Sequence, residues 1–225
     1  MPYLSSVPLN PLRSGAQRLL SSPQRMHAAV EGVLPPERQG RVLWRLERNG
    51  PHASLLVQSP ERPSLEHVVE QAGWPDATGG APRIADLEPL LFSLARGRQF
   101  GFRARLNPVQ NVPAAEGRST RRGHRTLAHQ LEWFTRRAQE DCWGFRLLKH
   151  GEEPTVGIVE RERLRFVRDR GGAHVIIDTA TFEGVIEVTN PSLLRNSLLN
   201  GIGSAKAYGC GLVTLATVSG HVVAR

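Results

Sequence analysis

The sequence predicts an α+β protein built from two units that share one order of elements. Residues 98–109, RQFGFRARLNPV, alternate between apolar and polar side chains, with the period of two that a half-buried strand requires. Runs of β-formers lie on both sides of stretches with helical periodicity, and each half of the chain reads strand, helix, strands, helix. Since the second half then ends in a strand, the order is βαββαβ, and the prediction is a tandem of two ferredoxin-like (RRM-like) domains.

The first domain is expected to span residues 1–92. After an opening strand, Pro23 interrupts the helical region. The pair Asn49-Gly50 lies between two runs of β-formers and predicts a hairpin. Gly73 ends the next helix, and the Pro/Gly-rich passage that follows has room for at most a short strand. The expected elements are a strand at 3–10, a helical region at 13–33, a hairpin at 41–59 and a helix at 64–73.

The second domain is expected to span residues 97–225, after a junction near 93–97. Its first strand leads into a charged loop at 116–125. In the helix that follows, Leu127, Leu131 and Phe134 are spaced to line one face. The remaining elements are strands at 143–148, 155–169 and 173–190, a helix at 190–201, a Gly-rich segment at 201–211 and a last strand at 212–218.

The charge of the chain predicts a nucleic-acid ligand. The net formal charge is +8 and the isoelectric point is about 10.8, above the value of roughly 9 that is typical of nucleic-acid-binding domains. Only Lys149 and Lys206 are lysines; the other basic residues are arginines, whose planar donors match phosphates. A GC-rich coding bias would explain the choice of arginine but not the net excess. An acidic protein or a membrane surface stays open as an alternative partner.

Several classes of protein are disfavoured by composition. No apolar run approaches the roughly 20 residues that cross a bilayer, so no membrane-spanning helix is expected, and RNA rather than a membrane is the expected partner. The N-terminus has no signal-peptide pattern. The two cysteines, Cys142 and Cys210, cannot form a metal or disulfide framework and fit reduced thiols in a cytoplasmic protein. The histidines form no plausible zinc set, and no metal is expected.

Two groups of arginines are candidate RNA-binding residues. The loop at 116–125 carries Arg118, Arg121, Arg122 and Arg125 among Gly, Ser and Thr; a merely solvated loop is the alternative. In VERERLRFVRDR, a strand would place Arg161, Arg163 and Arg165 on one face, about 7 Å apart. Such a row is destabilising unless anions lie against it, and its spacing suits duplex phosphates. Because aromatics are only 6% of the chain, structured RNA is favoured over single strands.

The segment GIGSAKAYGCG is a candidate phosphate-binding turn. Glycines such as Gly201 and Gly203 let the backbone approach a phosphate and present its N–H groups. The segment is neither a Walker loop nor a dinucleotide fingerprint. A tight helix-to-strand turn is the structural alternative, and Lys206 in its middle favours anion binding.

A histidine on the first domain's helical region does not fit the apolar pattern around it. Ser22 can cap this helix and Pro23 can occupy its first position. His27 lies about 100° around the helix from the apolar stripe, with Gln24 and Glu31 on its own side. The stripe itself consists of Met26, Ala29, Val30 and Val33. An ordinary surface histidine would give the same pattern.

Taken together, the motifs resemble the CRISPR-associated repeat-RNA endoribonucleases of type I-E systems, the CasE family of the RAMP superfamily. The resemblance covers essentially the whole chain, and the C-terminal Gly-rich segment is its most specific part. The matching stretches are PQRMH at 23–27, LWRLE at 43–47, RARLNP at 103–108, GFRLL at 144–148, TFEGVIEV at 181–188 and GIGSAKAYGCG at 201–211.

The resemblance implies an activity, partners and a mechanism. Members of the family bind the hairpin of a CRISPR repeat and cut on the 3′ side of its stem. They use the adjacent 2′-oxygen as nucleophile, without a metal or other cofactor. The products are a 2′,3′-cyclic phosphate (or 3′-phosphate) and a 5′-hydroxyl. The enzyme stays on the guide RNA and joins the other subunits of the Cascade surveillance complex. We expect a cytoplasmic protein that is monomeric when free.

The resemblance also assigns the site. The family's active-site histidine maps onto His27, while its tyrosine three residues earlier is replaced by Gln24, which cannot act as an acid or base. The expected catalytic residues are therefore His27 for proton transfer, with Arg25 and Lys206 at the phosphate. Gln24 and the arginines and glycines named above would contact the RNA. A non-catalytic CRISPR RNA-binding subunit is the alternative, and an unrelated basic ferredoxin-like enzyme is a more distant one.

Overall fold

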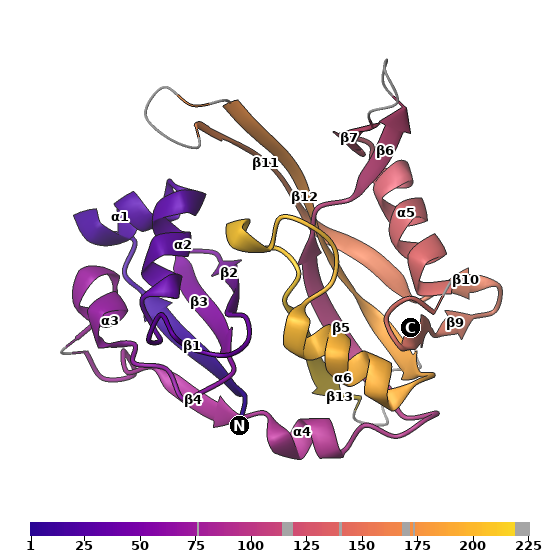
Figure 1. The fold of residues 1–225 in the computed structure, drawn as a ribbon, viewed down its shortest axis with the longest axis horizontal. Coiled ribbons are helices and arrows are strands. Elements are labelled where there is room, and N and C mark those ends of the chain that lie inside the picture. The colour runs from indigo at the N-terminus through magenta and orange to yellow at the C-terminus, as the bar shows by residue number, and fades with distance from the viewer. Residues whose placement is uncertain (76, 114–118, 140, 168–171, 173, 219–225) are drawn as a thin grey trace. The chain divides into compact units, whose positions relative to one another are not determined.

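The computed structural model describes residues 1–75, 77–113, 119–139, 141–167, 172 and 174–218. The chain forms two compact units (Figure 1), and both are discontinuous in sequence. Unit 1 combines Met1–Ser93 with Leu199–Gly201 and Lys206–Leu212. Unit 2 consists of Leu94–Leu198, Ile202–Ala205 and the chain from Val213 onward. The predicted limits of 1–92 and 97–225 omit this return of the chain to unit 1.

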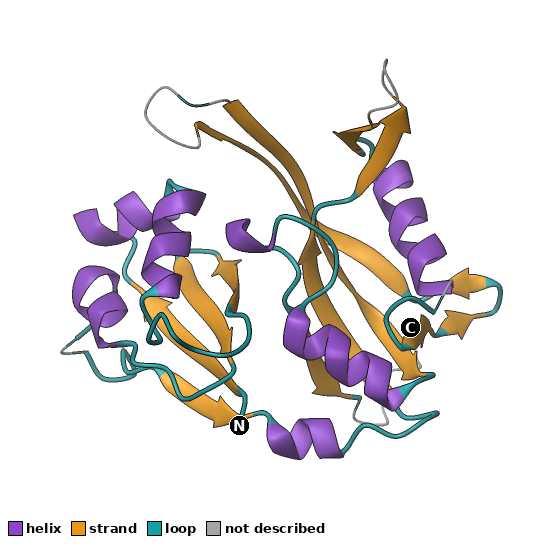
Figure 2. Cartoon of the chain, in the orientation of Figure 1, coloured by secondary structure: helices purple, strands orange, loops and turns teal. Residues whose placement is uncertain are grey.

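Unit 1 has the ferredoxin-like strand order. Its sheet is antiparallel in the order β2-β3-β1-β4, and helices α1, α2 and α3 lie on one side of that sheet (Figure 2). Gly50 turns the β2–β3 hairpin with a φ of +56°, as the Asn-Gly pair predicts. The elements are β1 (Tyr3–Leu9), α1 (Ser14–Leu20), α2 (Pro23–Glu31), β2 (Leu43–Asn49), β3 (His52–Ser59), α3 (Glu66–Ala72), β4 (Arg83–Asp86) and α4 (Glu88–Phe92).

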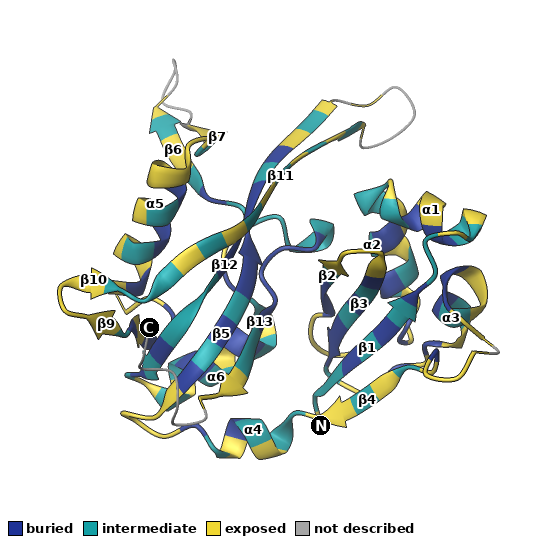
Figure 3. Ribbon diagram, turned by 180° about the vertical axis from the view of Figure 1, so that it is seen from behind, coloured by how far each residue is buried: buried dark blue, intermediate teal, exposed yellow. Residues whose placement is uncertain are grey.

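The core of unit 1 follows from periodicity. Alternate residues of β1 and β3 are buried against the helices, and α2 contributes the predicted stripe (Figure 3). The side chains of Met26 and Val30 are inaccessible to solvent, and Val33 is buried just beyond the helix. The apolar pattern predicted for this helix is thus confirmed, and it fixes which side of α2 faces outward.

Unit 2 repeats the order with insertions. Its main sheet runs β11-β12-β5-β13, all antiparallel, and β8 also pairs with β12. Its core stacks Phe134 of α5 on Phe102 and Phe182, with ring centroids 5.5 and 4.4 Å away. The elements are β5 (Gln99–Leu106), β6 (Val109–Pro113), β7 (Ser119–Gly123), α5 (Leu127–Gln139), β8 (Phe145–Leu147), β9 (Lys149–His150), β10 (Glu153–Pro154), β11 (Val156–Val167), β12 (His174–Val188), α6 (Pro191–Asn200) and β13 (Val213–Thr217).

Two sequence predictions are wrong in unit 2. The described end of the predicted loop, Ser119–Gly123, is strand β7 paired with β6, because the ladder satisfies backbone groups that a solvated loop would leave to water. In α5, Leu127 is 52% exposed, since it opens the first turn. Of the three predicted residues, Phe134 is fully buried and Leu131 is half-buried. The buried residues of α5 are Gln130, Trp133, Phe134 and Ala138.

The described residues contain no helix that is both long and apolar enough to cross a membrane.

Candidate active site

Helix α2 holds His27 in a defined position on unit 1. The Ser22 hydroxyl accepts a hydrogen bond from the Arg25 backbone N–H over 3.4 Å and caps the helix. Met26 and Val30 bury one side of α2 completely. His27 lies off that side with its side chain 36% exposed, so the ring is anchored by the helix and still reachable by a ligand.

His27 lines a pocket of about 320 Å³ whose wall includes several positively charged side chains. Lys206 enters it from the 3₁₀ helix η2 (Lys206–Tyr208), which contacts α2. The other lining residues are Glu31, Arg38, Gly40, Arg41, Val42 and Ala207. Three permanent or potential cations thus surround one histidine and one carboxylate, an arrangement suited to a phosphate.

Glu31 places a carboxylate beside the histidine ring. Its Oε1 lies 3.8 Å from Nδ1 of His27, one helical turn away, and its other carboxylate oxygen pairs with Arg38. Nδ1 is shielded from solvent and has no hydrogen-bond partner among the described residues. The solvent-accessible surface of the ring therefore belongs to its other atoms, which leaves Nε2 as the nitrogen available to a ligand.

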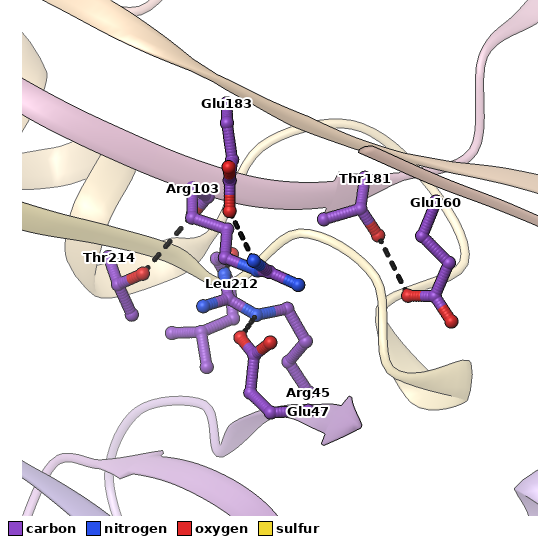
Figure 4. A network of polar contacts seen from close by, with 8 residues as sticks. All are labelled: Arg45, Glu47, Arg103, Glu160, Thr181, Glu183, Leu212 and Thr214. Carbon is purple, nitrogen blue, oxygen red and sulfur yellow. Dashed lines mark hydrogen bonds and ion pairs between the residues drawn. The ribbon is translucent and has the colours of Figure 1, made fainter. Parts of the chain in front are cut away.

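Lys206 reaches this pocket because the chain returns to unit 1 near its C-terminal end. Nη1 of Arg45 on β2, a side chain only 2% exposed, donates to the Leu212 carbonyl over 3.0 Å. Arg45 is neutralised by Glu47, 2.6 Å away (Figure 4). The returning segment is thus tied to the sheet by a buried, paired charge.

Two glycines explain how closely this segment approaches unit 1. At Gly209, with φ of +78°, an added Cβ would lie 2.7 Å from the Trp44 ring. At Gly201, with φ of +69°, it would lie 2.9 Å from the Gly211 carbonyl oxygen. Both positions combine a left-handed backbone with too little space for a side chain. The geometry gives Gly201 a turn-forming role; its predicted contact with RNA stays a prediction.

The environment of Lys206 lowers its pKa below the ordinary value of 10.5. Partial burial, which disfavours the charged form, is the main cause, and the nearby positive charge of Arg41 adds to it. An anion in the pocket would oppose both effects. The ammonium is therefore poised to gain stabilisation when a phosphate binds.

This lowered pKa predicts a pH-dependent affinity. Because the protonated form binds an anion better, affinity for a non-cleavable RNA should fall as pH rises through the pKa of free Lys206. Lys206→Arg, whose charge persists at high pH, should remove this decline. The measurement is Kd by fluorescence anisotropy from neutral pH to about 10. An identical decline in the variant would assign it to another group.

The structure separates the predicted catalytic residues. His27 and Lys206 line the same pocket, whereas Arg25 is exposed and does not line it. Two helical positions, about 200°, separate Arg25 from His27. Gln24 is half-buried on α2 and also outside the pocket lining. The roles predicted for Arg25 and Gln24 stay predictions without a place in this pocket.

Sequence analysis missed the two arginines of the pocket. Arg38 and Arg41 lie in the loop between α2 and β2, within LPPERQGR. The only available signal was two arginines in a Pro/Gly-containing connection just after the histidine helix. Loops of this kind often carry functional residues, but nothing in the local pattern shows which side chain turns toward His27.

In unit 2 the predicted arginine row exists, in a more neutralised form. Arg161, Arg163 and Arg165 are all exposed along β11. Arg163 pairs with Asp178 on the facing strand β12, with Nε to Oδ1 at 3.4 Å. Nε of Arg161 donates to the Gln130 side chain over 2.8 Å. The cross-strand ion pair of Arg163 with Asp178 thus offsets part of the repulsion that the sequence alone attributes to the row.

The remaining predicted RNA contacts are dispersed. Arg121 and Arg122 are exposed on β7, whereas Arg118 lies outside the described residues. Gly203, with φ of +72°, belongs to unit 2 and lines a pocket there together with Arg121. The structure therefore places Gly203 with Arg121 rather than with His27.

No group of three potential metal ligands occurs in the part of the chain that is described. His124 and His129 have ring centroids 6.1 Å apart. The pKa of His124 is lowered mainly by burial, and the positive charges of His129 and Arg136 add to this effect. The absence of a metal from the reaction stays a prediction.

Two ferredoxin-like units, one with a histidine among cationic side chains, place the chain in the tandem ferredoxin-like class. A family model described as CRISPR associated protein matches residues 2–217. The chain belongs to this family, as a member of its Cse3/CasE branch.

Its relatives cover most of the chain. It is 32% identical to the CRISPR-associated endoribonuclease Cse3 of Thermus thermophilus, over 95% of this chain and 99% of the relative. It is 27% identical to the Cascade subunit CasE of Escherichia coli K12, over 77% and 88%. A structure of Cse3 bound to a 19-nucleotide RNA superposes with a TM-score of 0.76 at 29% identity, covering 96% of this chain and 99% of that one. The predicted tandem ferredoxin-like fold is confirmed.

Proposed function

We propose that this protein is the endoribonuclease that processes CRISPR precursor RNA. It binds the repeat hairpin, cuts on the 3′ side of the stem and stays with the guide RNA in a Cascade complex. The observation that carries this proposal is the convergence of His27, Glu31 and Lys206 in one pocket. Family membership supports it, because Cse3 is named an endoribonuclease and one of its structures represents a pre-cleavage complex. The proposed place of action is the cytoplasm, with the free protein a monomer.

The pocket residues divide the chemistry among them. In the proposed mechanism Nε2 of His27 takes the proton from the ribose 2′-hydroxyl, while Glu31 beside Nδ1 stabilises the imidazolium that forms. The 2′-oxygen attacks phosphorus, and the bond to the 5′-oxygen breaks. Arg38 and Arg41 stabilise the charge that develops on the phosphate. The products are a 2′,3′-cyclic phosphate and a 5′-hydroxyl.

Lys206 is the proposed proton donor to the leaving 5′-oxygen. Its lowered pKa makes its ammonium a stronger acid than an ordinary lysine. This assignment accounts for a site in which Gln24 replaces the family's tyrosine: a second proton-transfer group comes from the returning segment. It also removes any need for Arg25 at the reaction centre.

Cleavage without divalent metal tests the proposed function. We expect the protein to cut the repeat hairpin from its own CRISPR locus at one site in EDTA. The 3′ end of the upstream product should resist ligation until phosphatase and kinase treatment exposes a hydroxyl. A hairpin with a 2′-deoxyribose at the cleavage nucleotide is the matched control and should bind without being cut. Tight binding of an intact all-ribose hairpin would instead support a non-catalytic RNA-binding subunit.

A further inference from the structure

A second pocket, in unit 2, is independent of the histidine site. It has a volume of about 560 Å³, within the range of roughly 300–1,000 Å³ that is typical of small-ligand sites. Strands β6 and β7 and helix α5, which lie near one another in Figure 1, contribute most of its wall. Gly203 and Ser204 of the Gly-rich segment complete it.

The wall of this pocket is strongly cationic. Arg121, Arg136 and Arg137 all line it, and none of its described lining residues is acidic. Arg136 and Arg137 lie in the last turn of α5 and are exposed. Three guanidinium groups around one concavity repel one another, so a bound anion would stabilise the arrangement.

The floor of the pocket is aromatic and rigid. Trp133 and Trp143 are both buried, with ring centroids 6.2 Å apart. Trp143 packs in turn against the core residue Phe134, at 5.5 Å. The Trp133 indole N–H donates to the Val109 carbonyl over 3.0 Å. Because these contacts fix the indoles, the floor is formed before any ligand arrives.

One guanidinium already lies over this floor. The central carbon of Arg137 lies 5.6 Å from the centroid of the Trp133 ring, a cation–π distance. A guanidinium held in this way offers its outer face to a nucleobase, a stacking mode that is common in single-strand RNA recognition. The exposed amide groups of Gln110 and Asn111 line the same pocket and can hydrogen-bond to a base edge.

The pocket does not suit a duplex. A paired base is enclosed by its neighbours in the stack, and only its phosphates could touch a cationic concavity. An unpaired nucleotide presents a phosphate, a planar base and a free Watson–Crick edge together. The arginine charges suit the phosphate, the guanidinium over Trp133 suits the planar base, and the amide groups suit the Watson–Crick edge.

The geometry points to a nucleotide-binding pocket in unit 2 that receives one unpaired nucleotide of the RNA flanking the hairpin stem. This inference rests on the proposed function, since it names a further part of the same RNA. It also extends the sequence prediction, which favoured structured RNA alone on the ground of few aromatics. Aromatic residues are scarce in the chain as a whole, but two tryptophans line this one pocket together with arginine, asparagine and glutamine side chains.

The test compares flanked and blunt hairpins. Three non-cleavable RNAs are needed: the bare repeat hairpin, and the hairpin with a 5′ or a 3′ extension of about five nucleotides, near the lower end of single-strand site sizes. Kd is measured at one salt concentration for the full chain and for Arg136→Ala/Arg137→Ala. The matched control, Arg48→Ala/Arg83→Ala, removes two exposed arginines from unit 1.

We expect one extension to improve affinity about tenfold, as one stacked base does. The pocket variant should lose this advantage, whereas the control should keep it. The arm that shows the effect identifies the flank. Asn111→Ala should change which base is preferred in that extension without changing thermal stability, which guards against a variant that merely misfolds.

Three results would overturn the inference. The extensions could add no affinity in the unchanged protein, the pocket variant could weaken all three RNAs by the same factor, or it could change nothing. Equal weakening would show an unspecific basic surface. Failure of the unchanged protein to bind even the bare hairpin would contradict the proposed function itself, and with it the pocket's assignment.

Discussion

Alanine at His27 is expected to lower the single-turnover rate of hairpin cleavage at least 100-fold, since general acid–base catalysis contributes about 10²–10⁴-fold. Hairpin affinity should change little, because the ring occupies one corner of a pocket whose cations remain. The fold should also persist, since the side chain is 36% exposed and the buried side of α2 is formed by other residues. Rapid-quench assays with enzyme in excess give the rate, and anisotropy gives the affinity.

A substitution at Glu31 tests whether its carboxylate supports proton transfer by His27. Glu31→Gln keeps the shape of the side chain next to Nδ1 but removes its charge. We expect a smaller loss in rate than for His27→Ala, with binding again preserved. If His27→Ala cuts at the normal rate, His27 is not the proton-transfer group and the mechanism proposed here is wrong.

Glutamate at Arg161, Arg163 and Arg165 together is expected to abolish measurable hairpin binding at moderate salt. The change replaces three exposed positive charges on one face of β11 with negative ones, where duplex phosphates would lie. Each lost phosphate contact should reduce the salt dependence of log K by roughly 0.7–0.9. Filter binding over a salt series measures both quantities.

Two controls separate charge from folding. Arg161 and Arg163 bond to Gln130 and Asp178 within unit 2, so the triple variant could lose stability. Arg165→Glu alone leaves those bonds in place and should still weaken binding and reduce the salt slope by about one contact. The matched control for net charge is a variant in which Arg18, Arg48 and Arg83 are all changed to glutamate. Equal affinity in the triple variant and the unchanged protein would place the duplex elsewhere.

Local patterns predicted the parts of this protein that local forces determine. The stripe through Met26 and Val30 follows from helical periodicity, and the alternation in β11 follows from the geometry of a strand. The βαββαβ order needed only element types and their sequence. These features are set by residues within about ten positions of one another, where periodicity is informative.

Long-range partners could not be predicted in the same way. Arg105 is one of the polar residues that alternate with apolar ones along β5, yet it is only 6% exposed and pairs with Glu162 of β11 at 2.5 Å. The pairing of Arg163 with Asp178 likewise depends on the register of β11 against β12. Register is fixed by tertiary packing and by a bulge near Ile158, and a single sequence does not reveal it.

In the histidine pocket, the features that lie close together in sequence could be predicted and the long-range contacts could not. The helix, its cap and the neighbour at Glu31 are encoded within ten residues. The meeting of His27 with Lys206 joins positions that are far apart in sequence, and only the family resemblance suggested that both act in one reaction. Arg38 and Arg41 had neither a local pattern nor a matching motif to indicate them.

The return of Lys206–Leu212 to unit 1 determines when, during synthesis, unit 1 can finish folding. A growing chain emerges from its N-terminus, and domains generally fold as they are completed. Unit 1 cannot finish folding when residue 93 has been made, because two of its contacts need a later segment of the chain. Arg45 bonds to the carbonyl of Leu212, and His27 shares its pocket with Lys206. A nascent chain shorter than about 200 residues would carry the histidine helix without the lysine opposite it. His27 and Lys206 can therefore share a pocket only after most of unit 2 has been made, so the strands proposed to bind RNA are synthesised before the proposed cleavage site is complete.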